Sequence, residues 1–286
     1  MKSLLAIAVT AALSGCAIIV ESGSDGDGHV HIASMATTRG SGVITTEART
    51  LGAVDQIRVT GPVDVDVTID AQPSMTVSGD DNLVPMVHTK QEGHTLVIGV
   101  DGSFSSHNRL KVTVVSPSLA AVDVRGSGDI SVNGLNGGSF ELASTGSGDT
   151  KLAGRIDALS VSMSGSGDLR AMELAARQVS IDQAGSGDAH LRAEDADRFT
   201  ANLRGSGNLE ARGQVKRLTG SLVGSGNMSL GKLMAEDVDL SEAGSGSISA
   251  VASHTARAIA SGSGSIEVHG NPRPLEVVGK HVHIGQ

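Results

Sequence analysis

Gly126-Ser127-Gly128-Asp129 is the first copy of a motif that recurs through the second half of the chain. Gly-Ser-Gly begins again at residues 146, 165, 185, 205, 224, 244 and 262, so successive copies lie 20, 19, 20, 20, 19, 20 and 18 residues apart. A steady period of this length is typical of a solenoid, in which each repeat packs only on its neighbours. A short polar residue follows every copy and can bond nearby backbone in a turn. These residues are Asp129, Asp149, Asp168, Asp188, Asn208, Asn227, Ser247 and Ser265.

Apolar residues alternate with polar ones on both sides of each turn. Leu169 and Ala171 follow one turn, and Leu159, Val161 and Met163 precede it. A period of two predicts strands, and strands of successive repeats would stack about 4.8 Å apart. Parallel crossovers strongly prefer one hand. We therefore predict an all-β fold, a right-handed parallel β-helix with about 19–20 residues per repeat.

Residues 43–118 alternate without the repeat, most clearly in Val63–Ile69. We expect a less regular β region that caps the N-terminal end of the rod, because a bare end exposes unpaired strand edges. Residues 119–286 hold the repeats, and 43–286 is expected to be one continuous domain. Near its end, the two prolines in 270–274 are expected to interrupt strand pairing.

The first residues predict export. A short positive start precedes the uncharged stretch Leu4–Leu13, which is too short to span a bilayer and is typical of a signal peptide. Leu13-Ser14-Gly15-Cys16 resembles the bacterial lipobox, whose Cys accepts diacylglycerol; an ordinary signal peptide is the alternative. The prediction is a signal peptide over 1–15, an acylated Cys16, and a flexible tether over 16–42. The predicted partner of the protein is the membrane, which the lipid anchor would bind. Ala17 is not the Asp that marks inner-membrane retention, which favours the outer membrane if the source is Gram-negative.

Composition excludes several classes of function. The 286 residues include 38 Gly and three Phe but no Trp or Tyr, and the formal net charge is −9. An acidic chain without clustered Lys and Arg is unsuited to nucleic acid, and no aromatic platform exists for stacking bases. The scarcity of aromatics also weakens sugar-stacking roles. Because 39% of the residues are hydrophobic, the chain can still bury a core.

One column of acidic residues is the candidate site: Asp129, Asp149, Asp168 and Asp188. Stacked in register, these carboxylates would lie about 5 Å apart and repel one another. We favour a turn-capping ladder in which each side chain bonds the backbone of its own turn, because Asn and Ser replace Asp in later copies. A weak cation site is the alternative. The pairs His29/His31 and His281/His283 each lack a clear third ligand. We predict no metal centre, cofactor or catalytic residue.

Several stretches match a known pattern in order, from Val54–Gly61 to Arg125–Asp129. Between these two lie Val63–Ile69, Gly79–Leu83, Leu96–Ile98, Leu110–Ser116 and Leu119–Val124. With the repeats, they make residues 42–268 resemble the putative auto-transporter adhesin, head GIN domain family of bacterial exported proteins. One departure is residues 54–57, where the family usually has a Phe. The resemblance implies an exported, surface-associated β-helical domain and carries over no catalytic residue.

The predicted function is therefore that of a non-enzymatic, lipid-anchored cell-envelope protein. Its role would be adhesin-like or structural, with an envelope glycan or protein as ligand. One alternative is an envelope polysaccharide lyase or hydrolase, since β-helices can carry such enzymes. Thinly spread acids and the missing Tyr and Trp argue against it. The other alternative is a calcium-stabilised structural rod.

Overall fold

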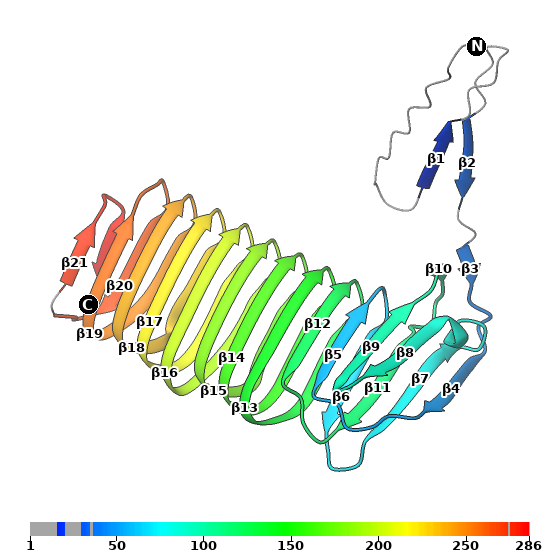
Figure 1. Cartoon of the computed structure of the whole chain (residues 1–286). Coiled ribbons are helices and arrows are strands. Elements are labelled where there is room, and N and C mark those ends of the chain that lie inside the picture. Colours follow the sequence, from blue (N-terminus) through cyan, green and yellow to red (C-terminus); the bar gives the residue numbers. More distant parts are fainter. Residues whose placement is uncertain (1–15, 21–29, 35–36, 274, 286) are drawn as a thin grey trace, which may run out of the picture.

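The computed structural model describes residues 16–20, 30–34, 37–273 and 275–285 (Figure 1). The predicted signal peptide, residues 1–15, lies outside these ranges. Within them the chain is mostly β-strand, and the short 3-10 helix η1 (Val84–Met86) lies in the N-terminal region. No helix in the described ranges has the length and apolar character needed to cross a membrane.

Long strands form the body of the molecule, and each runs from one Gly-Ser-Gly turn to the next. Each pairs in parallel with the strands of the neighbouring repeats, and Figure 1 shows them stacked along a rod. Equivalent residues lie one repeat apart, with Ile130 opposite Thr150 and Phe140 opposite Leu159. The predicted parallel β-helix is confirmed. Its long strands are β13 (Ile130–Gly146), β14 (Thr150–Gly165), β15 (Leu169–Gly185), β16 (Ala189–Gly205), β17 (Leu209–Gly224), β18 (Asn227–Gly244) and β19 (Ser247–Ala260).

The core consists of columns of side chains that run along the rod. Phe140 and Phe199 are buried at matching positions three repeats apart, and Leu159 and Val179 fill the positions between them. Neighbouring coils are one strand spacing apart, so each inward side chain stacks on its equivalents above and below. A second column holds the first inward residue after each turn: Ile130, Thr150, Leu169, Ala189, Leu209, Met228, Ile248 and Ile266.

The glycines of each turn are needed for two different reasons. Gly146, the first Gly of its motif, has φ of 144°, which L side chains rarely adopt. Gly148, the second, lies so close to the preceding coil that a Cβ would overlap the carbonyl oxygen of Gly128. The same overlap recurs at Gly167, against Gly148. The excess of Gly therefore follows from the tight stacking of the turns.

The solenoid begins one coil earlier than the first Gly-Ser-Gly motif. Strands β5 (Gln56–Thr60) and β6 (Asp64–Ile69) pair in parallel with β12 (Ala121–Gly126) and β13. Beyond this coil the pairing becomes partly antiparallel, which gives the predicted cap. The cap contains β4 (Ile44–Arg49), β7 (Ser74–Asp80), β8 (Val87–Glu92), β9 (Thr95–Val100) and β11 (Lys111–Ser116).

Parts of the expected tether form short strands, of which β3 pairs with the cap region. Strand β3 (Thr37–Arg39) pairs in parallel with β10 (Ser103–Ser105), and β1 (Cys16–Val20) pairs antiparallel with β2 (Val30–Ser34). A flexible tether over 16–42 remains a prediction, and within it the structure describes these short strands. Backbone pairing, which the Gly- and Ser-rich composition did not indicate, holds them.

Buried Asp80 fixes the entry of the chain into the cap. Its carboxylate accepts hydrogen bonds from the Ser106 hydroxyl, from Asn108 Nδ2 at 2.7 Å and from the Gly42 backbone N–H at 3.1 Å. The Ser106 and Asn108 bonds lower the pKa of Asp80, and burial only partly offsets them. Three separate segments are thus tied together at the N-terminal end of the rod.

Pairing continues past the two prolines near the C-terminus. After β20 (Ser265–Gly270), strand β21 (Leu275–Val278) pairs in parallel with β19, and β22 (Val282–Gly285) pairs in parallel with β20. The expected interruption is therefore confined to a loop, because Pro272 lies between strands and removes no ladder hydrogen bond.

Candidate functional site

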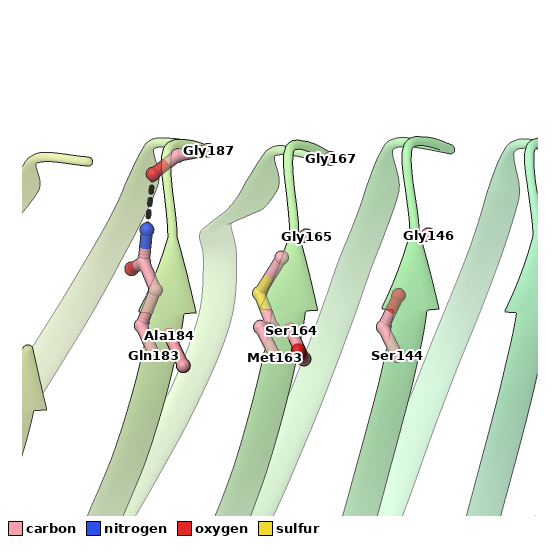
Figure 2. Close-up of a pocket in the computed structure, with 9 residues that line it drawn as sticks. All are labelled: Ser144, Gly146, Met163, Ser164, Gly165, Gly167, Gln183, Ala184 and Gly187. Atoms are coloured by element: carbon pink, nitrogen blue, oxygen red, sulfur yellow. Dashed lines mark hydrogen bonds between the residues drawn. The ribbon is translucent and has the colours of Figure 1, made fainter. Parts of the chain in front are cut away.

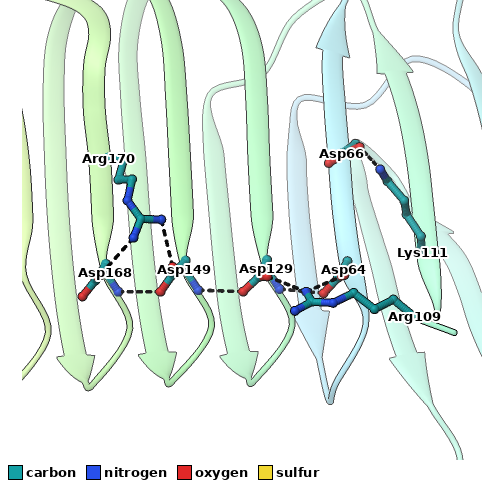
Figure 3. A network of polar contacts seen from close by, with 8 residues as sticks. All are labelled: Asp64, Asp66, Arg109, Lys111, Asp129, Asp149, Asp168 and Arg170. Carbon is teal, nitrogen blue, oxygen red and sulfur yellow. Dashed lines mark hydrogen bonds and ion pairs between the residues drawn. The ribbon is translucent and has the colours of Figure 1, made fainter. Parts of the chain in front are cut away.

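The four predicted ladder residues lie directly after their turns and form a continuous chain of hydrogen bonds, and Figure 3 shows three of them, Asp129, Asp149 and Asp168. Asp129 Oδ1 accepts a bond from the backbone N–H of Asp149 at 3.0 Å, and Asp149 Oδ1 accepts one from Asp168 at 3.1 Å. Asp168 Oδ1 accepts from Asp188 at 2.9 Å. The bonds therefore run from coil to coil, whereas we expected them within one turn. In-register stacking places the next backbone N–H only one strand spacing away.

The ladder extends beyond the predicted residues in both directions. Asp64 Oδ1 accepts a hydrogen bond from the Asp129 N–H at 2.9 Å, so Asp64 is its first member. At the other end the amide oxygens of Asn208 and Asn227 accept from the N–H groups of Asn227 and Ser247. An uncharged oxygen thus makes the same bond as a carboxylate. Asp64 had a sequence signal, because Gly61 and Asp64 keep the first and fourth positions of the motif.

Two arginines bridge neighbouring carboxylates of the ladder (Figure 3). Arg109 Nη1 lies 2.9 Å from Asp64 Oδ2 and 2.5 Å from Asp129 Oδ2. Arg170 lies 2.9 Å from Asp149 Oδ2 and 3.2 Å from Asp168 Oδ2. Each guanidinium therefore relieves the repulsion between two stacked carboxylates. Both arginines are exposed, so each ion pair contributes at most about 1 kcal/mol.

These contacts keep the groups charged. Burial alone would raise the pKa of Asp129, but the Asp149 backbone N–H and the Arg109 guanidinium together outweigh it and lower that pKa. The hydrogen bonds that Arg109 donates to Asp64 and Asp129 raise the pKa of Arg109 in turn. Nearby, Lys111 forms a further ion pair with Asp66 (Figure 3). The N-terminal end of the ladder is thus a row of alternating fixed charges.

The weak cation site along the ladder remains the untested alternative to capping. One oxygen of each predicted Asp from 129 to 168 accepts a backbone bond, and the other faces a guanidinium. Among the residues that the structure describes, no three His, Cys, Asp or Glu side chains are grouped as a metal ion would require. His31 and His283 lie on β2 and β22, whereas His29 lies outside the described residues.

Cys16, the predicted lipidation site, is the first residue of β1, and its backbone lies opposite Ser34 of β2. Acylation of its thiol remains a prediction, as does removal of the segment before it.

A narrow crevice lies beneath three successive turns (Figure 2). Ser144, Met163 and Gln183 occupy the same inward position on neighbouring coils and line it. Gln183 Nε2 donates a hydrogen bond to the carbonyl of Gly187, and Gln183 Oε1 is buried without a partner in the described chain. The crevice has no room for a water molecule, so it is a packing defect beneath the turns.

A second row of charges runs along the side of the rod, and the sequence analysis did not identify it. The register places Asp157, Arg177, Asp197, Lys216 and Glu236 at equivalent positions of successive coils, with alternating sign. Lys216 Nζ lies 2.7 Å from Asp197 Oδ1, which lowers the pKa of Asp197 and raises that of Lys216. The sequence does contain a signal for this row, because residues of opposite charge recur at the repeat spacing. The row borders an open groove lined by side chains of both signs.

Comparisons with known proteins agree with this architecture. Residues 53–196 and 171–272 match the family model described as putative auto-transporter adhesin, head GIN domain. A solved structure of a putative adhesin from Parabacteroides merdae is 17% identical, with a TM-score of 0.63, and the match covers 87% of this chain and 99% of that one. A putative adhesin and a putative lipid binding protein from Parabacteroides distasonis are 20% and 22% identical, with TM-scores of 0.63 and 0.61. Each of these matches covers 88% of this chain and all of the other. These likenesses show the fold. No curated protein matches the chain.

Proposed function

Because the chain belongs to the putative auto-transporter adhesin, head GIN domain family, we propose that it is a non-enzymatic surface protein with an adhesin-like role. The observation that carries this proposal is the family match, which spans both the cap and the repeats. The long side of the rod supports this proposal. Because the coils stack, polar and charged side chains recur along that side at a fixed strand spacing. Such a surface suits an envelope glycan or protein that offers repeated contacts.

The chemistry of the titratable groups supports a binding role over an enzymatic one. Several shifted pKa values occur at exposed ion pairs: the pair with Lys90 lowers the pKa of Glu92, and the pair with Lys232 lowers that of Glu210. Catalytic acids and bases usually gather in a concave pocket where burial and neighbours tune them. Here these pairs lie on separate outward faces of the strands. A polysaccharide lyase or hydrolase remains the alternative that the experiment must test.

Lipid anchoring at Cys16 is the second part of the proposal. The tether would leave the rod at its N-terminal end, where β3 pairs with β10 and Asp80 bonds the chain. The lipid on Cys16 would insert into a membrane, which would be the outer membrane in a Gram-negative cell. Cys16→Ala should abolish incorporation of an alkyne-labelled fatty acid and release the protein from membrane pellets. A variant that is still acylated and pelleted would overturn the anchor.

Surface binding is tested with the fluorescently labelled full chain on isolated cell envelopes. We expect the envelopes to retain the native chain saturably and to retain none of the thermally unfolded chain. The same incubations are assayed for reducing ends and unsaturated sugars. Release of such products would overturn the non-enzymatic assignment. Equal retention of folded and unfolded chain would overturn specific binding.

A further inference from the structure

The C-terminal end of the rod is a coil that nothing in the described chain covers. Its strands β21 and β22 pair with β19 and β20 on one side, and no described strand pairs with their other edges. Figure 1 shows this coil at the opposite end of the molecule from the N-terminal cap. Unpaired edges of parallel strands are templates for a further strand.

Apolar side chains of the core are exposed at this end. Leu275 and Val277 lie opposite the buried residues Ala256 and Ala258, and Ile284 lies opposite buried Val268. At this last coil, Leu275, Val277 and Ile284 are 44%, 40% and 39% exposed. They therefore face inward, along the core columns, but lack the next coil that would cover them. The end presents both open edges and an open core.

The N-terminal end differs, because the cap closes it. Antiparallel strands β7 and β8 follow the last parallel ones, and Leu83, Val84 and Val87 are buried beneath them. A head-to-tail stack would have to place the open coil against this closed cap. Strand β4 of the cap also has an open edge, and its Ile44 is 66% exposed, but β4 pairs antiparallel with β7 and has no buried residue, so it continues no core column. Among the described residues, the C-terminal coil is therefore the surface that carries both open parallel edges and exposed ends of the core columns.

We infer that a second copy of this chain docks on the C-terminal coil, tail to tail, about a twofold axis perpendicular to the rod. Such an axis reverses the strand direction, so β21 pairs antiparallel with the second copy's β21, and β22 pairs with its β22. The exposed core residues of the two copies then cover one another. A twofold interface is self-complementary and closes after two copies.

The expected strength follows from the size of the end face. Strands β21 and β22 have four residues each and span about 13 Å, and two packed sheets lie about 10 Å apart. With side chains, the end covers roughly 400 Å² per copy, or about 800 Å² in total, below the roughly 1,200 Å² of stable interfaces. Association should therefore be weak, with a Kd of about 10 µM to 1 mM.

Weak pairing at this end suits contact between two surfaces. This step rests on the proposed surface role. A rod held at its N-terminal end points its C-terminal coil outward, so copies on facing surfaces meet tail to tail. Many weak pairs acting together would hold the surfaces with high avidity.

Analytical ultracentrifugation of the full chain carrying Cys16→Ser tests the pairing without interference from thiol cross-links. We expect a monomer–dimer equilibrium, and hydrogen exchange should slow in β21 and β22 as concentration rises. Val277→Asp should weaken the dimer at least about tenfold, because the carboxylate would lose its hydration in the interface. Val223→Asp is the matched control, since Val223 is 47% exposed on the side of the rod. It should leave the equilibrium unchanged.

Three outcomes would overturn the inference: a monomer at about 1 mM, a dimer that Val277→Asp leaves intact, or open-ended oligomers. Hydrogen exchange is measured on the chain without Val277→Asp. Local unfolding caused by Val277→Asp therefore cannot produce the slower exchange that is expected for the dimer. A monomeric chain that still binds cell envelopes would remove this inference and leave the proposed surface role standing.

Discussion

Replacement of Asp149 separates the two interpretations of the aspartate ladder. Its Oδ1 accepts the Asp168 N–H at 3.1 Å, and its Oδ2 faces Arg170 at 2.9 Å. Asp149→Ala removes the acceptor and leaves that partly buried N–H unpaired, at a cost of about 1–3 kcal/mol. Asp149→Asn keeps the acceptor oxygen, as Asn208 already does at its own step of the ladder. It loses only the exposed ion pair, worth about 0–1 kcal/mol.

The assay is urea unfolding at neutral pH, followed by circular dichroism, with and without calcium. We expect the Asn variant to remain within about 1 kcal/mol of the unsubstituted protein, and the Ala variant to be clearly less stable. Because two arginines already bridge the carboxylates, we expect calcium to leave all three unfolding curves unchanged.

The result that would refute this reasoning is equal destabilisation by Asn and Ala. That outcome would mean that the charge of Asp149, and not its acceptor oxygen, stabilises the stack. If calcium also raised the midpoint of the unsubstituted protein but not of Asp149→Asn, the ladder would be a cation site. The calcium-stabilised rod would then replace the interpretation given above.

Three further predictions concern the packing of the turns and two buried carboxyl groups. Gly167→Ala should cost about 1–3 kcal/mol in urea unfolding, since its Cβ overlaps the preceding coil, whereas Gly138→Ala, in open space, should change stability by less than about 0.5 kcal/mol. Burial raises the pKa of Glu242, whose position Leu222 occupies one coil earlier. Glu242→Leu should therefore stabilise the fold by about 1–3 kcal/mol at pH 7 and by less at pH 4, where that carboxyl is mostly protonated even when unfolded. The lowered pKa of Asp80 means that its stabilisation is present above its ordinary pKa and lost in acid, so the deficit of Asp80→Ala in thermal unfolding should shrink as the pH falls.

The repeats could be predicted because two independent signals agree in every copy. Glycines recur at a fixed spacing, and the residues beside them alternate with a period of two. The coil formed by β5 and β6 lacks the full repeat motif, because Pro62 and Val63 replace its Ser-Gly. Only the strand register shows that Gly61 lies beneath Gly126.

The direction of the ladder bonds could not be predicted from residue types. Asp, Asn and Ser favour both capping of their own turn and bonding to a neighbouring coil. The choice depends on the distance between Asp149 and the next backbone N–H, which is set by the tight contact of Gly167 on Gly148. Arg109 and Arg170 were missed for a similar reason, because each lies about 20 residues along the chain from one of the carboxylates that it contacts.

The change from Asp to Asn along the rod has an electrostatic explanation. Arg109 bridges the first two carboxylates and Arg170 the next two, so those four carry paired charges. The fifth, Asp188, instead accepts both the backbone N–H and the side-chain Nδ2 of Asn208 with Oδ1, each at 2.9 Å. A carboxylate in place of Asn208 would lose that second donor and add a like charge one strand spacing away. Asn therefore continues the hydrogen-bond ladder where it no longer has arginines to balance it.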